Sequence, residues 1–395
     1  NIRNRADDSR RNDWTATSAI QKWGTTLIGI GIGARFPRLT DKVRRQEVAD
    51  LFSDFANEAD ADGVLNLFGL QTMAVETWLG KGEIFVRERP RDLTLPLAVP
   101  VQFQMLEPEF VPLLDADTWP GLPTGNRIRQ GIELNRYDRR IAYWMFKEHP
   151  GDNFNGTASP HDLVRVAASQ IWHVYKPDRP GQLRGVSMMA SVLARLRSTV
   201  DFEDAVLDRQ KLANLFVSFI TRTLPEAAWN DLDINTETGL PTMYDNDGSP
   251  MQGLEPGTQQ ELRPGEDVKF ANPPEAGTMF SEYLRSTLLG TSAGMGLPYE
   301  VLSGDIKNVS DRALRVMLNE FHRFAEQRQW QIIIPMFCQK AVDAFAKYAA
   351  LAGAISLEEI DLVRRCTHAP HGWAYIHPVQ DVQGKALEVQ SGFTS

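Results

Sequence analysis

The chain has 395 residues but only two cysteines, Cys338 and Cys366. Two cysteines cannot build a disulfide framework, and this usage suits a reducing compartment. Long apolar runs are also missing. The longest, TTLIGIGIGA, is well short of the roughly 20 residues that a membrane-spanning helix needs. The sequence shows no secretory signal. These absences argue against a disulfide-stabilised extracellular scaffold and against a membrane protein.

Positive charge is scarce as well. The chain carries 42 Lys and Arg against 51 Asp and Glu, a formal net charge of −9. This balance argues against tight DNA binding, which requires many neutralised phosphates. The segment 224–275 holds eleven acidic residues against Arg263 and Lys269, whereas the rest of the chain balances at 40 of each sign. One segment therefore carries the whole negative excess.

What is present is the composition of an ordinary globular protein. Hydrophobic residues make up 42% of the chain and charged residues 24%, and the length allows two or three domains with a sizeable core. The sequence begins at Asn1 without a methionine and ends in SGFTS, where a helical pattern is starting. We expect both natural termini to lie outside this sequence.

The first 180 residues predict an α+β domain. Residues 1–60 have a helical pattern, and GVLNLFGLQTMAVETWLGKG continues it until Gly80 and Gly82. Short β-branched and aromatic runs follow, separated by Pro, Gly and Asn, namely EIFVRER, VQFQMLE, GIELN, IAYWMFKE and QIWHVYK. ELNRYDRRIAYW predicts a hairpin around Tyr137–Arg140.

Beyond a basic Pro/Gly hinge, HVYKPDRPGQLRG, the pattern is that of two long helices around an acidic, irregular excursion. VSMMASVLARLRSTVDFEDAVLDRQKLANLFVSFITR keeps an apolar stripe, and TMFSEYLRSTLLGTSAG follows the excursion. A Gly/Pro loop leads to a last helical pattern from Ser310 to Ala352, which Pro335 should kink. This layout suits a protruding stalk with a tip better than a doubly wound sheet.

Two glycine motifs have catalytic or binding interpretations. GIGIGA (29–34) fits the loose dinucleotide fingerprint, but Arg35-Phe36-Pro37 follows where a helix would have to begin, so a turn or strand is favoured. GTSAG (290–294) fits the nucleophile elbow of serine hydrolases, yet a helix rather than a strand precedes Ser292. We keep a hydrolase using Ser292 as the alternative function and expect a helix end there.

Two clusters of titratable residues are weaker signals. CTHAPHGWAYIH brings together Cys366, His368, His371 and His377, but their spacing matches no common zinc pattern. DFEDAVLD (201–208) is best explained by ion pairs along a helix. The sequence also lacks a G-x-x-x-x-G-K-[ST] motif. We predict neither a metal nor a cofactor.

Several segments, in collinear order, resemble the lambda-type family of tailed-phage portal proteins. IWHVYKPDRPGQLRGVSMMASVL is similar to the family's strand ending in His, its R-x-G-Q-x-R-G turn and its long helix. GLQTMAVETWLGKGEIFV, GIELNRYDRRIAYW, LRPGEDVKFANP, GLPYEVLSGDIKNVSDRALR and HGWAYIHPVQDVQGKALEVQSGFTS resemble further family segments. The chain departs from the family at His377, where Asp is usual, and in KNVSDRALR, which lacks the common Ser-Tyr-Ser.

The resemblance implies a portal fold, with an α+β wing, long stem helices, a clip excursion, a tunnel loop and a C-terminal helical crown. It places the parts as follows: wing 1–186, stem helix 187–223, clip 224–277, second stem helix 278–297, tunnel loop 298–311, kinked wing helix 312–352 and crown 353–395. Such proteins form rings, usually of twelve subunits, at one capsid vertex of the virion, and double-stranded DNA passes through the ring.

The resemblance also implies partners and sites. The partners would be other copies of the chain, DNA, the terminase large subunit, the head–tail adaptor, and the major capsid and scaffold proteins, met in the host cytoplasm during assembly. Three sets of candidate residues follow: Asp305, Lys307, Asn308 and Arg312 at the DNA channel; Arg179, Arg184, Arg195 and Arg197 at the hinge and stem, pairing across subunits or facing DNA; and Asp233, Glu237, Asp245 and Asp247 for docking at the clip. No catalytic residue is implied. A monomeric DNA-binding module would need a basic face that the sequence does not show.

Overall fold

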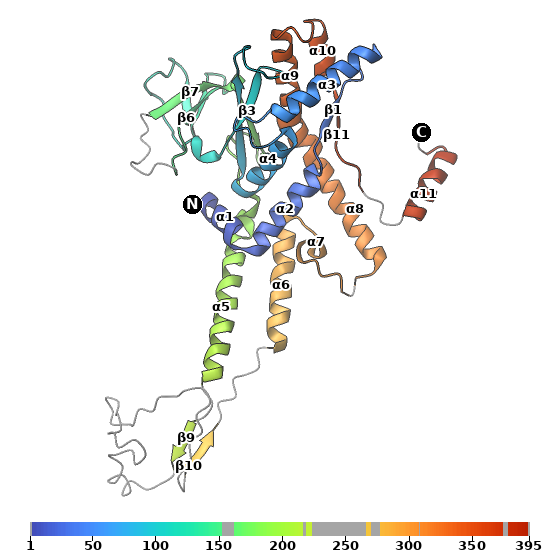
Figure 1. The fold of residues 1–395 in the computed structure, drawn as a ribbon. Helices are drawn as coiled ribbons and strands as arrows, with labels where there is room; N and C mark the ends of the chain where they lie inside the picture. Colours follow the sequence, from blue (N-terminus) through green and yellow to red (C-terminus); the bar gives the residue numbers. More distant parts are fainter. Residues whose placement is uncertain are drawn as a thin grey trace. The chain divides into compact units, whose positions relative to one another are not determined.

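The structure, a computed structural model, describes residues 2–151, 162–215, 219–222, 266–269, 277–307, 309–373 and 378–393 (Figure 1). It divides into two compact units, one formed by Asn1–Leu196 with Leu288–Ser395 and the other by Arg197–Thr287. Helices α5 (Leu193–Leu215) and α6 (Gly277–Met295) each contribute to both units. Within the described residues, no helix combines the length and apolarity needed to cross a membrane.

The first unit mixes helices and strands, as the sequence predicts. Its further helices are α1 (Ile2–Asn12), α2 (Trp14–Ile28), α3 (Lys42–Glu58), α4 (Leu67–Lys81), α7 (Tyr299–Ser303), α8 (Asp311–Arg328), α9 (Gln339–Leu351), α10 (Glu359–Arg364) and α11 (Pro378–Gln390). Its strands are β1 (Gly33–Arg35), β2 (Glu83–Pro90), β3 (Val101–Leu106), β4 (Arg127–Arg129), β5 (Ile132–Leu134), β6 (Arg140–Phe146), β7 (Leu163–Ala167), β8 (Ile171–Tyr175) and β11 (Thr367–Ala369). Short 3₁₀ turns occupy Pro108–Phe110, Ala168–Gln170 and Met188–Ser191.

The N-terminal helices begin and end where the sequence has capping residues. The Asp13 carboxylate accepts hydrogen bonds from the amides of Thr15 (2.8 Å) and Ala16 (3.0 Å) at the start of α2. Asn66 caps α4 in the same way, and Gly82 ends α4 with a left-handed φ of 97°. The predicted stop at Gly80–Gly82 is confirmed. GIGIGA leads into strand β1 and not into a helix, so the dinucleotide interpretation fails.

Strand β2 is the centre of an antiparallel sheet of order β3-β2-β8. Its side chains alternate between two cores. Ile84 and Val86 pack in the large core with the helices, whereas Phe85 packs in a second core with residues of β5, β6 and β7. EIFVRER is therefore buried on both faces, and the strands predicted from the apolar runs are all present.

The second sheet has the order β4-β5-β6-β7. The predicted hairpin joins β5 to β6. The Asn135 side chain accepts hydrogen bonds from the amides of Tyr137 (2.9 Å) and Arg139 (3.0 Å), and Asp138 has a φ of 59°. The turn is thus shaped by Asn135 and Asp138, since Asn and Asp side chains bond to the nearby backbone and tolerate a left-handed φ.

Three details differ from the sequence prediction. The long helix expected over 187–223 starts as a 3₁₀ turn, continues as α5 to Leu215, and gives way to strand β9 (Phe219–Arg222). Strand β9 pairs antiparallel with β10 (Glu266–Lys269) in the second unit, because its β-branched and aromatic residues suit a ladder. The loop expected over 298–311 contains helix α7. The C-terminal part, expected to be helical, contributes strand β11, which pairs with β1.

The predicted kink at Pro335 takes the form of a π-helical segment, Gln329–Cys338, between α8 and α9. Proline lacks an N–H and crowds the preceding turn of an α-helix. A π-helix bonds each residue five positions back, as the hydrogen bond from the Gln339 amide to the Ile334 carbonyl illustrates. Wider local winding therefore accommodates the proline without ending the helix.

Candidate functional site

The junction between the sheet and helix α5 is built around two glycines. A Cβ on Gly82 would lie 2.5 Å from the carbonyl carbon of Val186, and a Cβ on Gly185 would lie 2.0 Å from the carbonyl oxygen of Gly82. Real Cβ atoms do not approach backbone so closely, so only glycine fits at either position. The backbones of the α4–β2 turn and of the hinge therefore touch directly.

Glu83 follows this contact and is fully buried. Its carboxylate accepts hydrogen bonds from Arg184 Nε (2.7 Å), the Gly185 amide (2.7 Å) and His173 Nε2 (2.9 Å), and Arg3 of helix α1 reaches the same group. Burial alone would raise the pKa of Glu83, but the hydrogen bond from His173 and the neighbouring positive charges lower it to about 2. Four segments thus meet on one ionised carboxylate.

His173 is held neutral in this network. Burial lowers its pKa to about 4, although the hydrogen bond to Glu83 acts in the opposite direction. Arg140 Nη1 lies 3.1 Å from Nδ1, so Nδ1 accepts and Nε2 carries the proton donated to Glu83. The two neighbours fix the tautomer.

Arg184 is the buried cation of the junction. Besides Glu83, its guanidinium donates to the carbonyls of Pro108 (3.1 Å), Val111 (3.1 Å) and Gln130 (2.7 Å). The side chain is only 4% exposed. The expectation that Arg184 pairs across subunits or faces DNA is therefore wrong, because acceptors of its own chain surround it.

The loop before Arg184 is organised by Gln182. Its side-chain oxygen accepts hydrogen bonds from the amides of Asp178 (2.8 Å) and Arg179 (3.2 Å), and its side-chain nitrogen donates to the Arg184 carbonyl (2.8 Å). Arg179 is exposed. A shallow hollow between this loop and the 135–140 hairpin is lined by residues that include Arg140, Tyr175 and Arg179. Of the two hinge candidates, Arg179 is the one left at the surface.

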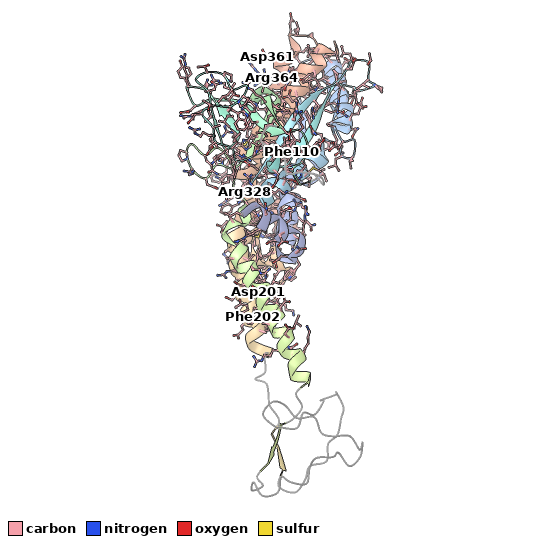
Figure 2. All side chains as sticks on the ribbon, turned by 90° about the vertical axis from the view of Figure 1, so that its left-hand side faces the viewer. Phe110, Asp201, Phe202, Arg328, Asp361 and Arg364 are labelled. Atoms are coloured by element: carbon pink, nitrogen blue, oxygen red, sulfur yellow. The ribbon has the colours of Figure 1, made fainter. Side chains whose placement is uncertain are left out.

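The two stem candidates lie on α5. Arg197 is exposed and forms an ion pair at 3.0 Å with Asp201, four residues along the helix. Figure 2 labels Asp201 on α5. Such pairs contribute little to stability. Arg195 lies against α6, since a Cβ on Gly290 would come within 2.1 Å of its guanidinium. A Cβ on Gly294 would come within 2.4 Å of Val192.

GTSAG is therefore a packing motif. Gly290 and Gly294 lie four residues apart on α6. Because they have no side chain, Val192 and Arg195 at the start of α5 can pack closely against them. Ser292 lies inside α6, is 3% exposed and donates to the Leu289 carbonyl at 2.9 Å. The nucleophile elbow requires a strand before the serine and a helix after it, and this geometry has neither. The observation removes the basis of the hydrolase alternative.

The acidic motif DFEDAVLD behaves as an exposed helix face. Lys211 pairs with Asp208 at 3.0 Å, three residues apart, as Arg197 does with Asp201. On another side of the helix, Phe202 packs its ring against the rings of Phe280 and Tyr283 of α6. The interpretation as ion pairs along a helix is confirmed for these two pairs.

Among the described residues, one cluster has the composition of a metal site: Glu107, Glu109 and His149 hold their ligand atoms within 4.8 Å of one another. Lys81 already supplies a cation there, with Nζ 2.8 Å from Glu107 and 3.5 Å from Glu109. Cys366 and His368 approach each other to 3.5 Å, but His371 packs beside Gly29, and His377 lies outside the described residues.

The comparisons with known proteins decide the family. The model for "Phage portal protein, lambda family" matches residues 1–329. The chain belongs to this family. The "Probable portal protein" of Halomonas phage phiHAP-1 is 24% identical over 68% of this chain and 51% of its own length. "Portal protein B" of Escherichia phage lambda is 23% identical over 80% of this chain and 62% of its own length. This portal-family chain thus spans about half to two thirds of the length of these relatives.

Solved structures show the same fold. A chain from the "Neck of empty GTA particle computed with C6 symmetry" covers 99% of this chain and 91% of its own length, with 13% identity and a TM-score of 0.54. A chain from the "Neck of native GTA particle computed with C12 symmetry" gives the same TM-score and identity, and covers 99% of this chain and 90% of its own.

Within this portal-family chain, the loop between α7 and α8 is held at its first end. The Lys22 ammonium donates to the carbonyls of Val301 and Leu302, and Gly304 ends α7 with a φ of 73°. The Asp305 carboxylate accepts the Lys307 amide at 3.0 Å, so it shapes the turn. Lys307 and Arg312 are exposed.

Asn308 lies outside the described residues, as do the four clip candidates Asp233, Glu237, Asp245 and Asp247. The sequence pattern does not single out Glu83, the buried carboxylate at the centre of the junction. The Gly-Glu turn at the end of α4 is visible in the sequence, but the hydrogen-bond partners of the Glu83 carboxylate come from residues far away along the chain.

Proposed function

We propose that this chain is the subunit of a portal ring at a single capsid vertex, through which double-stranded DNA is packaged and later ejected. The observation that carries the proposal is the similarity of fold over 99% of the chain to chains of neck assemblies computed with sixfold and twelvefold symmetry. Membership of the portal family supports it. The role is structural, and we infer no catalytic step.

The parts of the subunit follow from this proposal. Residues 1–186 and 312–352 form the wing, 187–223 and 278–297 the stem, 224–277 the clip, 298–311 the tunnel loop and 353–395 the crown. The glycine contacts of α6 with α5 and the stacking of Phe202 on Phe280 and Tyr283 support a paired stem. The Glu83 junction then holds the hinge 173–185 against the strand β2 within the wing.

The charge distribution fits a conduit. Attachment to DNA grows with the number of phosphates that a protein neutralises. A chain with a net charge of −9, all of it in one segment, repels the DNA backbone and lets it slide. Lys307 and Arg312, both exposed, would supply limited attraction within the channel, and Arg179 would meet a neighbouring subunit or DNA.

The partners follow from the position at the vertex. The acidic segment with Asp233, Glu237, Asp245 and Asp247 would dock the terminase large subunit and later the head–tail adaptor, and the wing would meet the major capsid and scaffold proteins. Assembly would take place in the host cytoplasm, and the mature location would be the virion.

Native mass spectrometry tests the proposal most directly. The purified chain should give a closed species of about twelve copies, and negative-stain images should show rings. A clean monomer at micromolar concentration, with no rings in the images, would contradict the proposal.

A further inference from the structure

Helix α11 carries an apolar stripe that the described chain leaves uncovered. Val379, Val382, Ala386 and Val389 follow one another in steps of three, four and three, which places them on one side of a helix. The three valines are 69%, 54% and 56% exposed. We call these four residues the α11 stripe. Spacing of this kind serves to bury side chains against a second helix.

The end of α11 carries a further exposed apolar side chain. Gly392 has a φ of 73°, and the Phe393 amide donates to the Glu388 carbonyl at 3.0 Å, which is the hydrogen bond of a Schellman cap. In that motif the residue after the glycine turns back toward the helix. Phe393 is nevertheless 83% exposed, so the cap presents a large apolar side chain at the end of α11.

Helix α8 carries the complementary surface. Phe321 and Ala325 face the core, whereas the outward side forms a shallow groove lined by Val316, Asn319, Glu320, Arg323, Phe324 and Gln327. We call this the α8 groove. Val316 is 62% exposed and Phe324 is 50% exposed. An apolar groove along a helix, with polar residues at its rim, is a surface into which an amphipathic helix can dock.

Stripe and groove are different surfaces, and one chain carries both. A contact between two unlike surfaces of identical chains is head-to-tail, so each copy can bind one neighbour on either side, and the series closes into a ring when the rotation allows. A surface that paired with itself would stop at a dimer. A second copy of the chain is therefore the occupant of the groove that fits the proposed ring.

Trp373, which precedes α11 in the chain, is held in place by α8. Its ring stacks on His322 with centroids 4.0 Å apart, and its Nε1 donates to Glu326 at 2.7 Å. Both partners belong to α8, and α11 begins five residues later. Trp373 is therefore anchored on α8.

We propose that the α11 stripe of one copy packs into the α8 groove of the neighbouring copy. The inference rests on the proposed ring, because it names one contact between adjacent subunits. One helix in a shallow groove is smaller than a standard stable interface. The contact therefore strengthens a ring that other surfaces also hold.

Cysteine cross-linking tests the pairing. A chain with Val382→Cys and Phe324→Cys, in a Cys366→Ser background, should form a ladder of disulfide-linked oligomers on oxidation. A mixture of the two single variants should stop at a dimer of one chain of each kind, which is the signature of a head-to-tail contact. The matched control replaces Phe324→Cys by Leu357→Cys, an apolar position 80% exposed elsewhere in the chain, and should give no ladder.

The outcomes separate this inference from the proposed function. Rings without cross-links, links confined within one chain, or links only between two Val382→Cys chains would each overturn the pairing and leave the portal ring in place. A head-to-tail ladder from a chain that forms no closed ring would support the contact and contradict the ring.

A charge placed in the stripe gives a second measurement. Val382→Asp should raise the concentration needed for half-assembly about tenfold, because assembly must then bury a carboxylate in an apolar contact. Gln380→Asp, on the opposite side of α11, should leave assembly unchanged. The two variants should melt alike as monomers, since α11 adds no residue to the large core. Equal assembly of both variants would contradict the inference.

Discussion

His173 connects the stability of the junction to pH. Burial lowers its pKa in the folded chain to about 4 from the ordinary 6.5, so between these values the unfolded chain binds the proton more readily. The free energy of unfolding should therefore fall as the pH drops from 6.5 toward 4. The contribution of Glu83, whose pKa falls from 4.5 to about 2, is present above pH 4.5 and is lost below it. His173 alone of this pair acts between pH 6.5 and 4.5.

His173→Gln tests this assignment. Glutamine can still donate to Glu83 but does not titrate, so the loss of stability between pH 6.5 and 4.5 should become shallower. Urea unfolding at several pH values measures the slope. His149→Gln, which changes a histidine outside the Glu83 network, is the control for replacing a histidine by glutamine as such. An unchanged slope in His173→Gln would mean that other groups cause the pH dependence.

Lys307 is the exposed cation of the proposed tunnel loop. If the proposed tunnel loop lines the channel, Lys307→Glu should leave ring assembly intact, because the side chain is exposed and adds little buried area. Retention of packaged DNA should fall, because a band of positive charge around the ring becomes negative. Lys42→Glu makes the same charge change at the exposed start of α3 and should retain DNA normally. A ring structure with Lys307 on the outer rim would rule the idea out.

Single residues also mark where sequence reasoning reached its limit. The basic hinge was recognised, and Arg179 is exposed as a surface contact requires. Arg184, five residues later, is buried against the carbonyls of Pro108, Val111 and Gln130. Those acceptors are backbone carbonyl oxygens, which every residue has, so the pattern of side chains in a sequence cannot predict which of them will accept a hydrogen bond. Charge alone therefore could not separate the structural arginine from the exposed one.

At the scale of elements, Gly294 sets how closely α6 approaches α5. Alanine usually stabilises a helix by about 1 kcal/mol relative to glycine. Here the added methyl group would meet Val192 at 2.4 Å, and the branched valine cannot swing away. Gly294→Ala should therefore destabilise the chain by about 1–3 kcal/mol.

Gly290→Ala is the matched control for Gly294→Ala, since its methyl group meets only the flexible end of Arg195. Urea unfolding should show that Gly290→Ala lowers the free energy of unfolding less than Gly294→Ala does, or leaves it unchanged. A second substitution, Val192→Ala, should recover much of the loss in Gly294→Ala. If the two glycine variants are equally stable, the close approach of Val192 to Gly294 does not limit which residue can occupy position 294.

The elements that sequence predicted well are those whose signal is local. Runs of β-branched and aromatic residues marked β2, β3, β6 and β8, and Gly82 marked the end of α4. Strand β11 has three residues, and its pairing partner β1 lies more than 300 positions earlier. No local period encodes such a pairing. The π-helical segment was visible only as Pro335, because its winding depends on the packing of the flanking helices.

For the whole molecule, the decisive feature is the segment 224–275, which carries the net charge of −9. In a conduit this charge should keep DNA from binding, so reversing part of it should make the assembled ring retain duplex DNA. Each acid-to-lysine change adds two positive charges, so Asp245→Lys with Asp247→Lys brings the segment from −9 to −5. Retention of a short linear duplex should rise at low salt, and its dependence on salt should steepen as more phosphates are neutralised.

The matched control for this charge reversal is Asp50→Lys with Asp54→Lys, two exposed acids on α3 that make the same change in net charge. Filter binding over a range of salt concentrations compares the two double variants. If retention depends only on net charge, both should gain equally, and the special role of the acidic segment is lost. If only the 245/247 variant gains, DNA meets the ring at that segment, as a channel mouth requires.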